Sequence, residues 1–256
     1  MPPSPLSLQP SPVSVDPAEV KRDIDVVLWS MKLCFIRRYF HQRFWERETM
    51  EAEYAARIEP FPRLETVAEH SWHVADTVLL LGGHFPSLNV DRSVRLAILH
   101  DKMEISIGDK NPVGKNGTGE STHAFNTDRQ ASKESSERYA IERYLARIRP
   151  SAVPDQRALL IEVLEGRTPE ARFVKAVDKL QALAFVMVKK RGLMLDKHLS
   201  FTLKYSEKAI GYFPDLRPHH EELRARLMVR VARSRGVSTS ELEDSLYNSQ
   251  LSFFPG

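Results

Sequence analysis

Residues 66–85 read TVAEHSWHVADTVLLLGGHF, and this stretch predicts a helix with one apolar face. The apolar positions recur at three- and four-residue spacing: Val67, Val74, Val78 and Leu81. His70 lies on the same face, because it follows Val67 by three residues and precedes Val74 by four. Pro86 ends the helix, since proline lacks a backbone donor and clashes with the preceding turn. The stretch therefore predicts a core helix that carries a histidine toward the interior.

Helical spacing continues on both sides of this segment. A first helix is expected to open at Pro17 with Asp16 as its cap, and a third to open at Asn89 or Asp91. Further helices are expected at about 129–147, 154–165, 169–191, 199–212, 218–234 and 238–247. Strand-like alternation is missing nearly everywhere and no internal repeat is present. The predicted fold class is therefore all-α, a helical bundle.

Composition limits the class of protein. The chain has 256 residues, of which 42% are hydrophobic and 28% charged, as is typical of a soluble globular protein. A formal net charge of +3 is too small for a protein that coats a nucleic-acid polymer. Cys34 is the single cysteine, so an internal disulfide and a cysteine-rich zinc site are excluded and a reducing cytoplasm is expected. No run approaches the roughly 20 apolar residues of a membrane span.

Three regions are expected along the chain. Residues 1–16 hold five prolines and neither a basic nor an apolar signal region, so a disordered leader is expected. Residues 17–195 form the predicted core. Residues 196–256 form a predicted C-terminal helical extension packed on that core.

Four ionisable side chains occupy inward positions of the predicted helices: His70, His100, Asp101 and Asp178. Taken singly, each has an ordinary explanation as a hydrogen-bonded core histidine or a paired carboxylate. Together they are costly to bury, because each desolvated carboxylate costs several kcal/mol unless it is compensated. One divalent cation compensates both carboxylates and uses both imidazoles, and this donor set suits Mn²⁺, Co²⁺, Fe²⁺, Ni²⁺, Mg²⁺ or Zn²⁺.

Sequence blocks around these residues resemble a known family. The blocks are RLETVAEHS at 63–71, HDKME at 100–104 with GD at 108–109, and EARFVKAVDK at 170–179. Their order and content resemble the H…HD…D signature of the HD-domain metal-dependent phosphohydrolases, in the 5′-deoxynucleotidase branch. The resemblance covers about residues 60–190 and implies an all-α HD-domain bundle.

The resemblance also implies roles for single residues. His70, His100, Asp101 and Asp178 match the metal ligands, and Glu104 matches the residue that orients or deprotonates the attacking water. Glu104 also lies one helical turn beyond His100 and Asp101. Asp109 matches a second acidic position, while Arg63 and Arg38, the latter followed by Tyr39, are matched to phosphate contacts. His123 is the single histidine between Asp101 and Asp178, which favours one metal ion over two.

A long loop is expected from Gly108 to Ser121, with four glycines and one proline. Lys110 and Lys115 in this loop can contact a phosphate, and an ordinary mobile surface loop is an equal alternative. The loop is longer than the family pattern suggests, so a substrate with more than one phosphate stays open.

The leading functional prediction is hydrolysis of a nucleoside 5′-monophosphate, a deoxynucleotide being the expected form. A nucleoside di- or triphosphate phosphohydrolase in a specialised pathway is the first alternative. A non-catalytic nucleotide-binding protein is the second. The resemblance further implies a homodimer with a small-molecule nucleotide substrate, and neither a nucleic-acid polymer nor a membrane is expected as a partner.

Overall fold

The computed structural model describes residues 16–39 and 64–251, the last four by their backbone alone. The leader at 1–15 and the predicted phosphate contact Arg63 lie outside the described residues. Within those ranges the chain is helical, and its one extended pairing is an isolated antiparallel bridge between Arg37 and Thr66. The all-α prediction is confirmed.

The helices of the described chain range in length from 4 to 22 residues. They are α1 (Pro17–Ser30), α3 (Val67–Gly82), α4 (Val90–Leu99), α5 (Glu104–Ile107), α6 (Thr127–Leu145), α7 (Val153–Glu165), α8 (Pro169–Lys190), α9 (Asp196–Ser206), α10 (Lys208–Tyr212), α11 (Arg217–Arg235) and α12 (Thr239–Leu251). Three 3-10 turns connect them, η1 (Met31–Phe35), η3 (Pro150–Ala152) and η4 (Pro214–Leu216).

The helices begin at the predicted caps. The Asp16 side chain accepts a hydrogen bond from Ala18 N, and Asn89 accepts one from Arg92 N. Thr66 and Glu69 form a reciprocal capping box at the start of α3, in which Glu69 Oε2 accepts from Thr66 N at 2.8 Å. This box fixes the first turn of α3, which carries His70.

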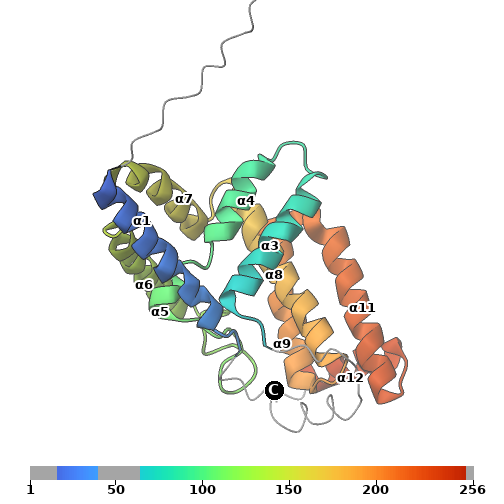
Figure 1. Ribbon diagram of the computed structural model, residues 1–256. Helices are drawn as coiled ribbons and strands as arrows, with labels where there is room; N and C mark the ends of the chain where they lie inside the picture. Colours follow the sequence, from blue (N-terminus) through green and yellow to red (C-terminus); the bar gives the residue numbers. More distant parts are fainter. Residues whose placement is uncertain (1–15, 40–63, 252–256) are drawn as a thin grey trace, which may run out of the picture.

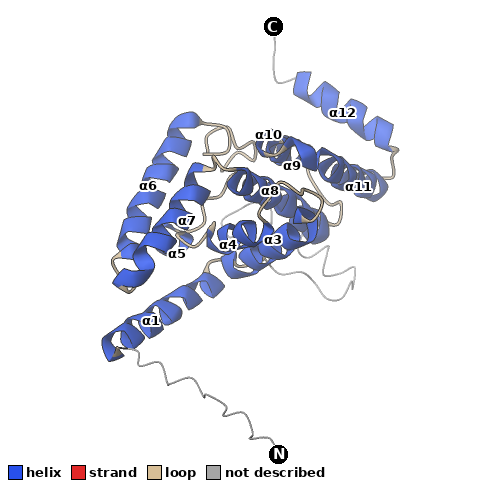
Figure 2. Cartoon of the chain, turned by 90° about the horizontal axis from the view of Figure 1, so that it is seen from above, coloured by secondary structure: helices blue, strands red, loops and turns tan. Residues whose placement is uncertain are grey.

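Helix α8 is the centre of the bundle. It packs against α3 and α4, against α7, and against α9, α10 and α11 (Figures 1 and 2). Phe173, Val174 and Val177 on α8 have no exposed surface, and they pack in one core with apolar side chains of α3, α4 and α7. Contacts on several sides make α8 the frame on which side chains from α3 and α4 are brought together.

The structure differs from the predicted elements in two places. The helix expected at 199–212 is two helices, α9 and α10, interrupted at Glu207. They bury different faces, because Phe201 of α9 packs on the loop before α6 whereas Ala209 of α10 packs in the main core. A single straight helix would not bring both Phe201 and Ala209 to these two places. The short helix α5, directly after the predicted His-Asp pair, was also not expected.

The helices after residue 195 share the cores of the preceding ones. Ala209 and Leu216 belong to the main core, while Leu227 and Val231 of α11 pack with Leu183 of α8. The boundary at 195 therefore stays a prediction. No helix in the described part of the chain has both the length and the apolar character that crossing a membrane requires.

Candidate metal centre

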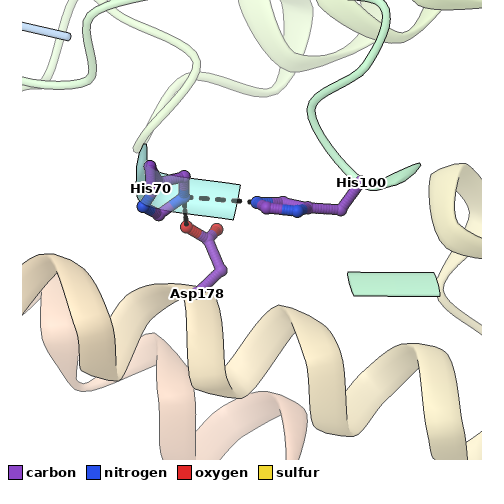
Figure 3. A group of neighbouring side chains, drawn as sticks. All are labelled: His70, His100 and Asp178. Carbon is purple, nitrogen blue, oxygen red and sulfur yellow. Dashed lines mark hydrogen bonds and ion pairs between the residues drawn. The ribbon is translucent and has the colours of Figure 1, made fainter. Parts of the chain in front are cut away.

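Three helices bring three predicted ligands to one point. His70 lies in the first turn of α3, His100 directly follows α4, and Asp178 lies in the middle of α8. His70 Nε2 is 3.1 Å from Asp178 Oδ1 and 3.2 Å from His100 Nε2 (Figure 3). The ligand atoms of the three residues all lie within 4.8 Å of one another. Two ligands about 2.1 Å from a common ion lie about 3 to 3.5 Å apart, so the geometry suits one cation.

Asp101 adds a fourth donor to this group. Its Oδ2 is 3.2 Å from His100 Nε2 and 3.5 Å from His70 Nε2. The structure therefore brings together all four residues that were predicted as ligands. Their role as ligands remains the proposal developed below.

The ring nitrogens on the far sides of both imidazoles already have partners. His100 Nδ1 donates to the Ala97 carbonyl at 2.7 Å, and His70 Nδ1 donates to Gln181 Oε1 at 2.7 Å. When each ring is neutral, its Nε2 carries the lone pair, because a neutral imidazole has one N–H. Two such lone pairs and two carboxylates repel one another unless positive charge lies among them. Without a bound cation, protons take that place: burial lowers the pKa of His100, but the Asp101 and Asp178 carboxylates more than offset it. The residues present therefore fit a divalent ion.

Electrostatics keep the two carboxylates ionised in this buried place. Burial alone raises the pKa of Asp178, but the Lys179 ammonium and the His70 ring more than offset it, and the pKa lies well below its usual value. Burial likewise raises the pKa of Asp101, but His100 and His70 together more than offset it, and the pKa lies below its usual value. Both oxygens needed by a metal are therefore available at neutral pH.

Glu104 and Asp109 lie beside the four donors and line the same cavity. Glu104 is the first residue of α5, is buried, and has an Oε2 atom without a hydrogen-bond partner among the described residues. Burial, with the nearby Asp101 and Asp109 charges, raises the pKa of Glu104 well above its usual value. Asp109 Oδ2 accepts a long hydrogen bond of 3.4 Å from Tyr39 N, and burial also raises its pKa. An unpartnered buried carboxylate in this position is suited to holding a water molecule.

Arg38 reaches the site through a short extended pairing. Arg38 N donates to Glu65 O at 3.0 Å, and Val67 N donates to Ile36 O at 2.8 Å. This pairing places Arg38 against the first turn of α3. There its guanidinium donates to Glu65 Oε1 at 2.7 Å and lines the cavity.

The cavity is about 130 Å³ in volume and opens to solvent. Of the two loop lysines predicted to contact phosphate, Lys110 lines the cavity. Lys115 is exposed and is not among the residues that line it. One of the two loop lysines therefore lies at the cavity, and its contact with phosphate stays a prediction.

Other lysines line the cavity that the sequence reasoning missed: Lys133, Lys175, Lys179 and Lys208. Lys179 is the most directly placed, since its Nζ donates to Asp178 Oδ2 and lies over the Tyr205 ring. One indication of this role for Lys179 was present in the sequence, namely its position next to Asp178. There was no such indication for Lys208, which comes from a helix far along the chain.

His123 lies in the cavity wall but apart from the ligand group. Burial, with the neighbouring Lys133 and Lys179, lowers its pKa to about 3, so the ring is neutral at physiological pH. Three lysines influence its charge and lie nearby, which is unsuited to a second cation. This placement agrees with the prediction of a single metal ion.

The loop that precedes α6 forms part of the wall of the cavity. Gly119 N donates to Val113 O at 2.7 Å, and Lys208 Nζ donates to Ala124 O at 2.6 Å. Val113 and Ala124 pack with Phe201 of α9 in a small apolar cluster. Of the two alternatives for this loop, a mobile surface segment is disfavoured, because the loop is hydrogen-bonded and packed.

Comparison with known proteins agrees with the fold and the site. The sequence profile of the HD domain matches residues 55–212, more than half of the chain. The chain therefore belongs to the HD-domain family.

Individual relatives make the placement more specific. The chain is 28% identical over 137 residues to the 5′-deoxynucleotidase hdd1 of Schizosaccharomyces pombe, covering 53% of this chain and 64% of that protein. It is 30% identical over 152 residues to the 5′-deoxynucleotidase HDDC2 of Xenopus laevis, covering 57% and 68%. The match thus spans just under two thirds of the length of the yeast relative.

Solved structures share the fold. A predicted metal-dependent phosphohydrolase of Magnetospirillum magnetotacticum aligns with a TM-score of 0.56 at 22% identity, covering 83% of this chain and 97% of that one. A conserved hypothetical protein of Pyrococcus furiosus aligns with a TM-score of 0.50 at 24% identity, covering 79% and 99%. These likenesses show the bundle architecture.

Proposed function

We propose that the protein is a metal-dependent phosphohydrolase that releases phosphate from a nucleoside 5′-monophosphate, with a deoxynucleotide as the expected substrate. One observation carries the proposal: three of the four converging donors, His100, Asp101 and Asp178, line a cavity together with Glu104, whose carboxylate has a buried oxygen without a partner among the described residues. The 5′-deoxynucleotidase names of the two sequence relatives support the choice of substrate.

The proposed ligands are His70, His100, Asp101 and Asp178. When bound, the divalent ion supplies Lewis-acid stabilisation of the phosphoryl oxygens. Mn²⁺, Co²⁺, Fe²⁺, Ni²⁺, Mg²⁺ and Zn²⁺ all accept this mixed nitrogen and oxygen donor set.

The side chains of the cavity perform the remaining steps. Glu104 accepts a hydrogen bond from the attacking water and takes its proton as the new P–O bond forms, with Asp109 assisting from the other side. The bond from phosphorus to the 5′-oxygen breaks, and one proton passes to that leaving oxygen. Lys179, Lys110 and Arg38 offset the charge on the transferring group, and Arg63 stays a proposed further contact.

Charge balance favours one phosphate over three. Equal numbers of basic and acidic side chains line the cavity: Arg38, Lys110, Lys133, Lys175, Lys179 and Lys208 against Asp101, Glu104, Asp109, Glu134, Glu137 and Asp178. A divalent ion adds two positive charges, which a phosphate monoester of about two negative charges neutralises. A triphosphate brings more negative charge than this wall matches, and Lys115, which favoured such a substrate, lies away from the cavity.

A substrate panel tests the proposal. Deoxynucleoside mono-, di- and triphosphates with each of several divalent ions should give phosphate release that is fastest for a monophosphate and absent in a chelator. Preference for a triphosphate, or binding of nucleotides without turnover, would overturn it.

We further propose that the protein acts as a homodimer in the cytoplasm. Apolar side chains on one face of α1 and η1 are exposed: Val20, Ile24, Val27, Leu28, Met31 and Phe35. Trp72, Leu79 and Leu80 of α3 are exposed as well, and α3 contacts η1. An apolar patch of this extent on a soluble chain favours a second copy as the partner, because a stable interface buries roughly 800 Å² on each side.

Sedimentation velocity tests the dimer. Leu28→Glu and Leu80→Lys each place a charge in the patch, so they should convert a dimer to a monomer. Leu195→Glu, at the exposed position directly before α9, should leave the dimer intact. A monomeric unaltered protein at micromolar concentration would refute this part of the proposal.

A further inference from the structure

Four buried side chains form a connected group behind the metal centre. Arg38, Glu65, His70 and Gln181 are each no more than 8% exposed. Arg38 Nη1 donates to Glu65 Oε1 at 2.7 Å, and Gln181 Nε2 donates to Glu65 Oε2 at 3.1 Å. Gln181 Oε1 lies 2.7 Å from His70 Nδ1. The two oxygens of the Glu65 carboxylate therefore accept hydrogen bonds from two different neighbours, Arg38 and Gln181.

This arrangement determines which way the Gln181 amide faces. An ionised carboxylate only accepts hydrogen bonds, so the NH₂ group of Gln181 must face Glu65. Its carbonyl oxygen must then face the imidazole of His70. An oxygen at this distance requires a hydrogen on His70 Nδ1. In the neutral ring, which is the form that binds a metal, the lone pair is then on Nε2, the atom nearest Asp178 and His100.

Arg38 is a competitor for the same ring nitrogen. Arg38 Nη1 also contacts His70 Nδ1 closely. An arginine that donated to Nδ1 would move the imidazole hydrogen to Nε2 and remove the lone pair from the metal centre. Glu65 prevents this, because it supplies Arg38 with a better acceptor and holds the Gln181 amide in the opposing orientation.

Helix α8 holds both sides of the same ring. Asp178 contacts His70 Nε2, and Gln181, three residues later, contacts Nδ1. Positions three residues apart lie on one helix face, so both groups reach the ring from the same side. The imidazole is thereby fixed in rotation as well as in tautomer.

We propose that Glu65 is the positioning residue that sets the tautomer of His70, acting through the amide of Gln181 and by occupying Arg38. The inference rests on the proposed metal centre for its purpose. Its content, the position of one hydrogen, is a property of the metal-free protein.

Isosteric exchanges at these positions give a sharp test. In Glu65→Gln, the new amide must offer its oxygen to Arg38 and its NH₂ to Gln181. The Gln181 amide must then turn its own NH₂ toward His70 Nδ1, and the imidazole hydrogen moves to Nε2. In the exchanged pair Glu65→Gln with Gln181→Glu, the carboxylate at position 181 accepts from both sides and the hydrogen returns to Nδ1.

The first measurement is the tautomer itself. Nitrogen-15 chemical shifts of the His70 ring in chelator-treated protein should report a hydrogen on Nδ1 in the unaltered chain and in the exchanged pair, and no hydrogen on Nδ1 in Glu65→Gln. The second measurement is Mn²⁺ affinity by calorimetry. Glu65→Gln should weaken it about 10- to 100-fold, the usual effect of altering a group that orients a ligand, and the exchanged pair should recover most of the loss.

The controls separate positioning from packing. Asp155→Asn, which removes one charge from an exposed ion pair with Arg95, should change neither reading. Melting temperatures identify a variant that has lost its fold, and Gln181→Leu provides a second disruption that should also weaken Mn²⁺ binding. Retention of Nδ1–H and full affinity in Glu65→Gln would overturn the inference, as would an exchanged pair that folds but recovers neither reading. Failure to hydrolyse nucleotides would refute the proposed function and leave this result unaffected.

Discussion

Lys179 Nζ donates to Asp178 Oδ2, while the other oxygen of that carboxylate lies 3.1 Å from His70 Nε2. One carboxylate thus joins an ammonium group to the predicted metal centre. Burial lowers the pKa of Lys179, but Asp178 and the Tyr205 hydroxyl more than offset it, and the pKa lies well above its usual value. The lysine is therefore charged and stands at the edge of the site where phosphate is expected.

Lys179→Met should have opposite effects on the affinity for Mn²⁺ and on the kcat/KM for the substrate. Mn²⁺ affinity should rise, because the ammonium no longer competes for Asp178. The kcat/KM for a deoxynucleoside monophosphate should fall about tenfold or more, since a charge-assisted hydrogen bond is worth roughly 1.5 to 3 kcal/mol. Calorimetry and steady-state kinetics measure the two. A parallel loss of both would mean that Lys179 supports the fold of the site and does not contact phosphate.

Glu104→Gln should lower kcat by about 10²- to 10⁴-fold, the usual contribution of general base catalysis. Metal content should stay nearly unchanged, because Glu104 is not one of the four converging donors. Elemental analysis of the purified variant, together with single-turnover kinetics, checks both statements. Loss of the metal would make Glu104 a ligand and contradict its assignment as the base.

The same variant should affect stability in a pH-dependent way. The pKa of Glu104 is raised in the folded protein, so the folded state holds its proton more tightly than the unfolded state. Its contribution to stability is present below the usual carboxyl pKa of about 4.5 and is lost as the pH rises through the raised value. In metal-free protein, Glu104→Gln should therefore raise the melting temperature more at pH 8 than at pH 5. Equal shifts at both pH values would show that the carboxyl is not perturbed.

The positions of the predicted ligands followed from the sequence because helix periodicity fixes the face of each residue. His70 shares a face with Val74 and Val78, both fully buried, so its inward position could be predicted without coordinates. Asp178 is similar, since Val174 and Val177 beside it are also fully buried. Periodicity cannot show that residues on separate helices meet at one point. That expectation came from the family resemblance.

Other features depended on contacts between distant segments. Gln181 and Glu65 are separated by 116 residues, so nothing in the local sequence of either one indicates that they meet. Val20, Ile24 and Val27 recur at helical spacing in α1, but periodicity does not tell whether another helix covers them, and all three are exposed. The break between α9 and α10 arises because two neighbouring segments pack on different partners, a relation absent from local sequence.

Gly119→Ala tests whether the loop before α6 is a built wall of the cavity. Gly119 has a φ of +75°, and a Cβ atom there would lie 2.4 Å from Phe201 Cε2 and 2.9 Å from the Pro112 carbonyl. Positive φ and two close contacts each oppose the substitution, so the free energy of unfolding should fall by roughly 1 to 3 kcal/mol. Gly211→Ala in α10 is the matched control, because no atom lies within 4 Å of its added Cβ and alanine favours a helix by about 0.5 to 1 kcal/mol. Urea denaturation should therefore show a lower free energy of unfolding for Gly119→Ala and a higher one for Gly211→Ala.

The same pair of variants tests contact with the substrate. Because Pro112, His123 and Ala124 of this loop line the cavity, the KM for the nucleotide should rise in Gly119→Ala alone. An unchanged KM with reduced stability would show that the loop supports the fold without contacting the substrate.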